Sequence, residues 1–353
     1  MNKNQKRELQ QLSEEDVKFL TASLLNQKIT AIQRLEGGKN NQIYLLSGKQ
    51  NYVAKVYFRD SFDLRNRLYA EYQSLKFLWD NGIRSIPQPL AQDPEKNLGI
   101  YGFIEGTKIA SKDISLKELN AATLFLKEIN KLQSKAEKLL LASDACFCTK
   151  DYFNIVARRL EDLSKVPESS SAEKELHLFL REEFQPFFQK IFSVTETLIR
   201  QEGLSIETEI TKNQKILSPS DFGFHNALQD KDQNIIFLDF EYFGWDDSAK
   251  TISDFLLHPG MQLSEKHKKY FAQKMFDSLN EGKIRQRVKI TYPLVGLIWC
   301  LIILNEFVPR HQIRREFAVN QGDLNKKAQL EKAKQLLNSL KEYKTTYWEE
   351  NFN

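Results

Sequence analysis

The chain has 353 residues, of which 41% are hydrophobic and 28% charged, so it is long enough for two folded domains and is neither a disordered nor a fibrous protein. Its formal net charge of +4 is too small to indicate nucleic-acid binding, and we expect no nucleic-acid partner. The cysteines Cys146, Cys148 and Cys300 include no CxxC pair, which favours packing roles in a reducing compartment.

Neither a signal peptide nor a membrane helix is expected. Residues 1–20 carry charges throughout and lack the apolar centre of a signal peptide, which favours a cytoplasmic protein. The most apolar stretch, 294–304, has about half of the roughly 20 residues that a membrane helix needs. Asn305 and Glu306 follow it directly. We therefore expect a buried core helix there and no membrane partner.

The first hundred residues are predicted to be rich in β structure. Runs with β-branched and aromatic residues predict three strands, and the turn at 47–50 makes the last two antiparallel neighbours. A helix is predicted next, because its leucines form one stripe and Gly82 follows its end. Another strand ends in a glycine turn. The strands cover 29–35, 42–48, 51–58 and 100–106, and the helix covers 62–79.

Beyond residue 111 the pattern is mainly helical. The segment 168–175 is predicted to be an exposed loop or a helix start. One exception interrupts the helices, namely a loop over 215–230 that leads to a short apolar strand within 234–244. The predicted helices cover 115–140, 151–164, 172–202, 264–279, 291–307 and 326–345.

Lys55 and Glu71 are predicted to form a buried ion pair. Glu71 lies between Leu68 and Leu75 at spacings of three and four, which puts a carboxylate on the apolar face of the helix. Lys55 interrupts a strand that should be largely buried, where an unpaired ammonium would be costly. The alternative is that Lys55 extends to water and Glu71 lies at the edge of the stripe.

The turn that contains Gly37, Gly38, Asn40 and Asn41 joins the first two predicted strands. Paired glycines allow backbone N–H groups to approach a phosphate closely, so this turn is a candidate phosphate-binding loop. It is not a Walker A sequence. The alternative is that the glycines serve only to form a hairpin turn.

Asp221, Asn226 and Asp239 form the third candidate group. Asp221 and Asn226 are five residues apart on the interrupting loop, and Asp239 follows the apolar run 235–238. Carboxylate and amide oxygens suit Mg²⁺, which keeps positions free for substrate phosphates. The alternative is that these residues form turns and caps.

In chain order, the glycine turn, the strand lysine, the helix glutamate, the loop aspartate and asparagine, and the strand-end aspartate reproduce the working parts of a kinase. GGKNNQIY, SDFGFHN and LDFEYFGWDDSAKTISDF resemble the glycine loop, the catalytic loop and the metal-binding segment of the aminoglycoside phosphotransferase and choline kinase family. The resemblance spans about 31–260, most of the chain.

This resemblance implies an α+β fold with two lobes, like that of protein kinases. The smaller lobe, 1–105, would hold an antiparallel sheet with one key helix and bind nucleotide, with a hinge at about 103–106. The larger lobe, 106–353, would be mainly helical and would carry the catalytic loop 218–226 and the metal-binding segment 235–247.

The resemblance also implies the role of each residue. Lys55 would hold the α and β phosphates of ATP, with GTP as the alternative nucleotide, and Glu71 would orient Lys55. Asp221 would be the catalytic base for a hydroxyl of a small-molecule acceptor, while Asn226 and Asp239 would hold Mg²⁺. Phe103, Ile104 and Glu105 would bind the adenine edge through their backbone. Asp247 and Asp254 would brace the catalytic segment.

The acceptor is left open among sugars, amino sugars, amino alcohols and aminoglycoside-like molecules. Glu241, Trp245 and Asp246 are candidate acceptor residues. Trp299 is another, with a core role as its alternative, in which the indole needs only one hydrogen-bond partner.

One position departs from the family pattern. Pro219 stands where the family has a histidine two residues before the catalytic Asp, and it offers a rigid backbone instead. His225 is interpreted as a loop side chain rather than as a base. Because of Pro219, the alternative function is a pseudokinase that binds nucleotide as a regulatory module without turnover.

Overall fold

The computed structural model describes residues 12–35, 40–59, 65–279, 281–318 and 325–342. The chain divides into two compact units, and each is described by itself. Unit 1 comprises Met1–Thr107, Leu228–Tyr242 and Ile313–Gly322, and unit 2 comprises Lys108–Ala227, Phe243–Gln312 and Asp323–Asn353. The sequence had placed the boundary after residue 105 and the whole segment 235–247 in the second lobe, whereas this division puts 228–242 with the sheet.

A five-stranded antiparallel sheet forms the centre of unit 1, in the order β1-β2-β3-β5-β4. The three expected N-terminal strands are present, but β4 was not predicted, and Pro89 occupies its first position as edge strands allow. The strands are β1 Ala31–Leu35, β2 Asn41–Ser47, β3 Asn51–Tyr57, β4 Pro89–Asp93 and β5 Leu98–Gly102.

The strand predicted over 100–106 is two separate strands. β5 ends at Gly102, residues 103–105 lie outside any strand, and β6 covers Gly106–Lys108. β6 belongs to a second, three-stranded sheet in the order β6-β8-β9, with β8 at Ala227–Asp230 and β9 at Ile235–Phe237. The predicted hinge therefore connects the two sheets.

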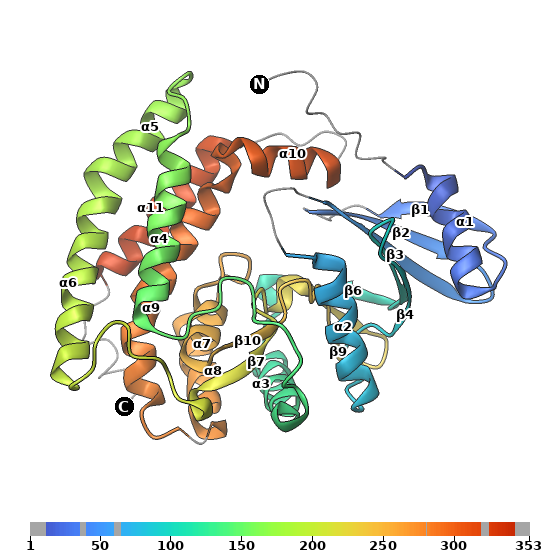
Figure 1. Ribbon diagram of the computed structural model, residues 1–353, viewed down its shortest axis with the longest axis horizontal. Helices are drawn as coiled ribbons and strands as arrows, with labels where there is room; N and C mark the ends of the chain where they lie inside the picture. Colours follow the sequence, from blue (N-terminus) through green and yellow to red (C-terminus); the bar gives the residue numbers. More distant parts are fainter. Residues whose placement is uncertain (1–11, 36–39, 60–64, 280, 319–324, 343–353) are drawn as a thin grey trace. The chain divides into compact units, whose positions relative to one another are not determined.

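The helices α1 and α2 lie wholly within the described part of unit 1. The key helix α2 spans Arg67–Asp80, and it begins later than predicted because Asn66 caps it by accepting the Tyr69 N–H at 2.9 Å. Helix α1, Glu14–Leu25, was not predicted, and it begins at a capping box formed by Ser13 and Asp16. Figure 1 shows α1 beside β1, where Val17 packs into the apolar core of the sheet.

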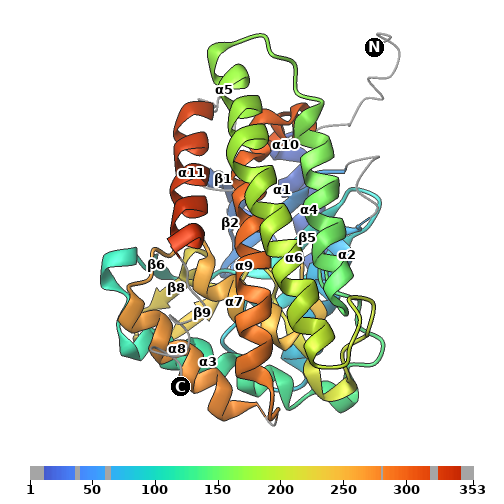
Figure 2. The same cartoon turned by 90° about the vertical axis from the view of Figure 1, so that its left-hand side faces the viewer.

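Helices dominate unit 2. Figure 2 shows α9 among α4, α6 and α11, all of which contact it. The helices are α3 Leu116–Asn130, α4 Thr149–Ser164, α5 Ser171–Phe179, α6 Gln185–Gln201, α7 Ser248–Leu257, α8 Glu265–Ser278, α9 Ile284–Ile303 and α11 Lys326–Glu342, while α10, Pro309–Ala318, begins in unit 2 and ends in unit 1. Two short strands, β7 Lys215–Ser218 and β10 Gly244–Asp247, pair antiparallel.

The helix α9 contains the apolar stretch singled out in the sequence. Within the described part of the chain, Ile284–Phe307 is the one segment long and apolar enough to cross a membrane, and 78% of its most apolar window is buried inside the protein. This burial is what the prediction of a core helix requires.

Two helix predictions need correction, and two further helices were missed. The helix expected over 115–140 ends at Asn130, because the Asn130 side chain pairs with the backbone of Leu217 in β7 at 2.7 and 3.0 Å. The helix expected over 172–202 consists of α5 and α6 joined by a π-turn at Leu180–Phe184. The helices α7 and α10 were not predicted.

Candidate active site

Lys55, in unit 1, is the candidate phosphate-binding residue. The lysine lies in the middle of β3 opposite Ile43 and Gly99, and it is 7% exposed. Its Nζ lies 2.6 Å from Glu71 Oε2 and 2.6 Å from Asp239 Oδ1. The predicted ion pair of Lys55 with Glu71 is thus present, and the alternative of a lysine extended to water is wrong.

Glu71 joins the sheet to the segment after β9. Its Oε2 also accepts a hydrogen bond from the Tyr57 hydroxyl at 2.6 Å, and its Oε1 accepts one from the Phe240 N–H at 3.3 Å. The Tyr57 and Tyr101 hydroxyls are 2.8 Å apart. Sequence reasoning missed both tyrosines, although Tyr57 lies two residues after Lys55 and therefore on the same face of β3.

Glu241 contributes a third carboxylate to the same unit. It is fully buried, and its oxygens lie 2.6 Å from Arg67, 2.6 Å from Asn41 Nδ2 and 3.8 Å from Lys55. The sequence had offered Glu241 as an acceptor residue, but these contacts favour a role beside Lys55 instead. Arg67 was also missed, because nothing in the sequence pairs the start of α2 with a residue after β9.

We refer to Glu71, Asp239 and Glu241 as the carboxylate cluster, since one oxygen of each lies within 4.8 Å of the others. Burial would lower the pKa of Lys55, but the three carboxylates outweigh it and raise that pKa well above its usual value. Burial raises the pKa of Asp239 to about 7, against the opposing effect of Lys55. For Glu241 burial acts in the same direction, yet Lys55 and Arg67 outweigh it and lower the pKa.

The carboxylate cluster fits a divalent cation. When all three carboxylates are ionised they face the positive charges of Lys55 and Arg67, so one negative charge is left over in this group. Oxygen donors with excess negative charge are what Mg²⁺ prefers. The Asp239 side chain is 30% exposed and the Asp239 backbone has φ 65°, a conformation uncommon for a residue other than glycine. Asp239 is therefore the member of the cluster most open to a ligand.

The remaining predicted nucleotide residues also belong to unit 1. Gly37 and Gly38 lie outside the described residues, whereas Asn40 Nδ2 lies 3.4 Å from Glu241 Oε1. Because 103–105 take no part in a strand, their backbone groups are not used by a sheet ladder. Residues 103–105 line a hollow of about 490 Å³ together with Trp79, Arg84 and others.

Asp221 is the centre of the candidate catalytic loop, in unit 2. It follows β7 and precedes a 3₁₀ turn at Phe224–Asn226. Asp221 Oδ1 lies 2.9 Å from His258 Nε2 and 3.1 Å from His225 Nε2. Asn226 Nδ2 donates to the Asp221 backbone carbonyl at 3.1 Å and lies 3.3 Å from Asp221 Oδ2. The contact between Asp221 and His258 was not predicted, because 37 residues separate them.

The two imidazoles keep Asp221 ionised. Burial would raise the pKa of the Asp221 carboxyl, but the hydrogen bonds from His225 and His258 outweigh burial and hold that pKa well below its usual value. Burial lowers the pKa of His258. Asp221 is therefore a carboxylate at neutral pH.

The candidate acceptor residues have structural contacts in unit 2. Asp246 is fully buried, pairs with Lys250 at 2.9 Å and accepts the Cys146 N–H at 3.0 Å. Trp245 donates its indole N–H to the Ala136 carbonyl at 3.0 Å. Because Asp246 has no exposed surface, its position favours a structural role over contact with an acceptor.

Asp247 and Asp254 have the contacts expected of bracing residues. Asp247 caps α7 by accepting the Ala249 N–H at 2.8 Å and also pairs with Arg287. Asp254 pairs with Lys250 at 2.9 Å and accepts the Trp299 indole N–H at 3.0 Å. Trp299 is 8% exposed, so the predicted alternative of a core indole with one hydrogen-bond partner describes it.

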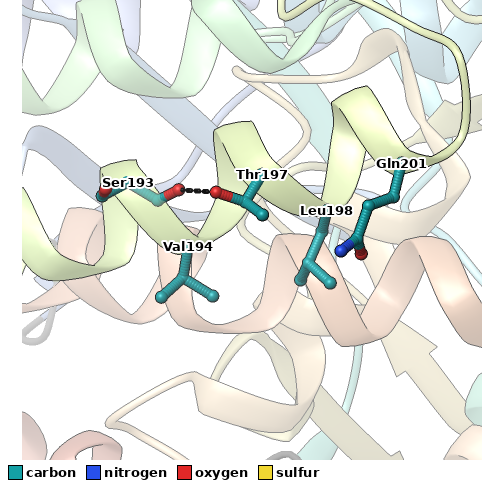
Figure 3. Close-up of a pocket in the computed structure, with 5 residues that line it drawn as sticks. All are labelled: Ser193, Val194, Thr197, Leu198 and Gln201. Carbon is teal, nitrogen blue, oxygen red and sulfur yellow. Dashed lines mark hydrogen bonds between the residues drawn. The ribbon is translucent and has the colours of Figure 1, made fainter.

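A second hollow, of about 210 Å³, lies on α6 (Figure 3). Its walls are Ser193, Val194, Thr197, Leu198 and Gln201, and the Thr197 hydroxyl is used in a hydrogen bond to the Ser193 carbonyl at 2.9 Å. Since no ionisable side chain lines it, this hollow offers no catalytic chemistry and is not the candidate site.

No protein-family model and no curated protein sequence matches the chain. Its fold matches solved structures. Spectinomycin phosphotransferase in complex with ADP and spectinomycin has a TM-score of 0.62 at 13% identity, over 94% of this chain and 99% of that one. Choline kinase LicA from Streptococcus pneumoniae has a TM-score of 0.59 at 17% identity, over 92% and 99%.

The ethanolamine kinase from Plasmodium vivax has a TM-score of 0.57 at 14% identity, over 87% of this chain and 82% of that one. At these identities the similarity shows the fold. The expected kinase-like α+β fold is confirmed, and these three structures are small-molecule kinases or phosphotransferases, as the sequence resemblance implied.

Proposed function

We propose that this protein is an ATP- and Mg²⁺-dependent phosphotransferase that phosphorylates a hydroxyl group of a small molecule. The observation that carries the proposal is the buried Lys55, whose ammonium lies 2.6 Å from both Glu71 and Asp239. In kinases a lysine held by a helix glutamate contacts the nucleotide phosphates, and a nearby aspartate holds the metal. ADP in the spectinomycin phosphotransferase structure and AMP in a LicA structure support nucleotide use.

In this proposal Lys55 binds the α and β phosphates, and Glu71 keeps the ammonium in place. The proposed Mg²⁺ ligands are those that the sequence resemblance implies, Asn226 and Asp239, and bound Mg²⁺ would neutralise charge on the phosphates. The backbone of 103–105 would bind the adenine edge. ATP is the expected nucleotide, and GTP is the alternative to be compared with it.

Asp221 is the proposed catalytic base. The acceptor hydroxyl oxygen would form a bond to the γ-phosphorus while the bond from that phosphorus to the β–γ bridging oxygen breaks, and ADP leaves with the electron pair. The hydroxyl proton would pass to Asp221. A carboxylate with a low pKa is a weak base, so orientation of the hydroxyl is a large part of this role.

The proposed acceptor classes are sugars, amino sugars, amino alcohols and aminoglycoside-like molecules. Solved structures of the same fold include a choline kinase, an ethanolamine kinase and a spectinomycin phosphotransferase, which supports testing amino alcohols and spectinomycin first. We place the reaction in the cytoplasm. The second candidate function, a nucleotide-binding pseudokinase, is favoured by Pro219 in the catalytic loop.

The test is ADP formation from MgATP across an acceptor panel, for wild type and Asp221→Asn. We expect turnover with one acceptor class, and a loss of about two to four orders of magnitude in the variant. MgATP affinity should be nearly unchanged in Asp221→Asn. MgATP binding without turnover on any acceptor would favour the pseudokinase, and absence of MgATP binding by wild type would refute both candidates.

A further inference from the structure

Asp221 has a hydrogen-bond partner from outside its own loop. The ring of His258, in the turn that follows α7, lies with Nε2 2.9 Å from Asp221 Oδ1. We propose that His258 is a positioning residue for phosphoryl transfer, whose Nε2–H holds the Asp221 carboxylate in the orientation that receives the acceptor hydroxyl. This inference rests on the proposed function and adds a residue to the same site.

The hydrogen bonds of His258 assign its tautomer. The backbone N–H of Gly260 donates to His258 Nδ1 at 3.1 Å, so Nδ1 carries a lone pair and the ring proton is on Nε2. Nε2 therefore donates to Asp221 Oδ1. A neutral imidazole with its one N–H donor held in place can orient a carboxylate. A hydrogen bond between Asp and His has the same orienting effect in the Ser-His-Asp triad of proteases.

Packing holds the His258 ring in one plane. His258 stacks on His225 at a centroid distance of 3.7 Å and 8° between ring planes, and the Trp299 ring meets it edge-on at 4.5 Å. Trp299 is itself tied to Asp254 by its indole N–H. The His258 side chain is 10% exposed. A side chain packed against two aromatic rings and hydrogen-bonded at both nitrogens loses little further freedom when the substrate binds.

Gly260 leaves the space that this arrangement needs. A Cβ at position 260 would lie 3.1 Å from His258 Nδ1 and 3.2 Å from His225 Cβ, closer than side chains normally pack. The turn at 258–260 is thus shaped around the two imidazoles.

The arrangement distinguishes the two oxygens of Asp221. Oδ1 lies 2.9 Å from His258 and 3.1 Å from His225, whereas within the described part of the chain Oδ2 has one hydrogen-bond contact, the longer one of 3.3 Å to Asn226. Oδ2 is therefore the oxygen left for the acceptor hydroxyl. A half-turn of the carboxylate would only exchange two equivalent oxygens, but a partial rotation would turn the free oxygen away from the acceptor hydroxyl. The hydrogen bond from His258 to Oδ1 opposes that partial rotation.

Two substitutions of His258 separate its two hydrogen bonds. In His258→Gln the amide nitrogen can occupy the place of Nε2 and keep the donor to Asp221. In His258→Asn the shorter side chain reaches only the place of Nδ1, so the Gly260 contact is kept and the Asp221 donor is lost. The matched control is His177→Asn, which removes a different histidine hydrogen bond, the 2.7 Å contact to the Val166 carbonyl.

We expect His258→Asn to lower kcat about 100-fold, because displacement of a catalytic group by about 1 Å costs that much. The KM for MgATP should not change. His258→Gln should keep kcat within about tenfold of wild type by the same reasoning, and His177→Asn should have wild-type kcat. Thermal unfolding of each variant shows whether the fold is intact, and the Gln and Asn pair remains informative if both lose similar stability.

Equal kcat for His258→Asn and wild type, in an enzyme that does turn over an acceptor, would overturn the role of His258 while leaving the proposed kinase intact. Equal losses in the Gln and Asn variants would also overturn it. If wild type shows no turnover, the proposed function fails instead. A measurement independent of activity is the imidazole ¹⁵N chemical shift of His258, since a proton found on Nδ1 contradicts the assigned tautomer.

Discussion

Replacement of Lys55 by methionine removes the cation from the carboxylate cluster without a large change in side-chain volume. In wild type, Lys55 and Arg67 face Glu71, Asp239 and Glu241. In Lys55→Met, Arg67 is the one cation of this group left, so the excess negative charge grows from one to two unless Asp239 takes up a proton. We expect the variant to be less stable and to bind Mg²⁺ more tightly in the absence of nucleotide.

The size of the effect follows from burial. Removing one partner of a buried ion pair costs about 3–5 kcal/mol, because the other partner is left as an uncompensated charge. Protonation lowers this cost, because Asp239 already has a pKa of about 7 and takes up a proton when Lys55 is lost, which removes its uncompensated charge. A pKa raised above the unfolded value favours the folded state at low pH, so the destabilisation should grow as pH rises through about 7.

The assay is urea unfolding at pH 8 with and without about 10 mM Mg²⁺. A ligand stabilises the folded state appreciably only when its concentration exceeds its Kd, so a weak site needs Mg²⁺ in the millimolar range. The matched control is Lys250→Met in unit 2. Lys250 is also buried and also bridges two carboxylates, Asp246 and Asp254, each at 2.9 Å. Asp246 has no exposed surface, whereas the Asp239 side chain is 30% exposed.

Both variants should therefore be destabilised, but Mg²⁺ should restore stability in Lys55→Met and not in Lys250→Met. Equal responses to Mg²⁺ in the two variants would refute the reasoning, because the carboxylate cluster would then have no special affinity for the ion. Lys55→Met should also lack phosphotransferase activity with every acceptor that wild type uses.

Three further predictions concern single side chains. Asp239→Ala should abolish Mg²⁺-dependent nucleotide binding in calorimetry, and unchanged MgATP affinity would contradict the metal assignment. Tyr57→Phe should lower stability by about 1–2 kcal/mol in urea unfolding, because Glu71 loses a buried donor; no loss would mean that the donor is dispensable. Burial would raise the pKa of Asp144, but Arg159 and Arg158 outweigh it and lower that pKa to about 2, so Asp144→Asn should cost roughly 2 kcal/mol at pH 7. That cost should shrink as pH falls from 4 towards 2, and a cost independent of pH would rule out the ion pairs as its source.

Much of unit 1 could be predicted from the sequence, because its signals are local. The alternation of apolar side chains specifies β1, β2 and β3, and the leucine stripe specifies α2. Lys55 and Glu71 break these patterns at buried positions, and a buried charge must find a partner, so their pairing followed from the sequence. The unpredicted β4 and α1 have weaker patterns, and contacts with the rest of the sheet and its core stabilise them.

The end of α3 shows where local signals stop. The helical pattern continues beyond Asn130, but the Asn130 side chain bonds the backbone of Leu217, which is 87 residues away in the sequence. Helix propensities depend on residues close in the sequence, so they cannot predict that contact. The same holds for Glu241, offered as an acceptor residue but buried beside Arg67 and Lys55.

The sequence by itself determined which residue types the proposed function depends on and their order along the chain, because Lys55, Glu71, Asp221 and Asp239 each disrupt a pattern or occupy a turn. Only the tertiary structure decided which further side chains surround them. His258 shares no helix or strand with Asp221, and Tyr101 shares none with Glu71. Side-chain hydrogen bonds between distant segments depend on how the chain packs, and spacing along the sequence does not specify that packing.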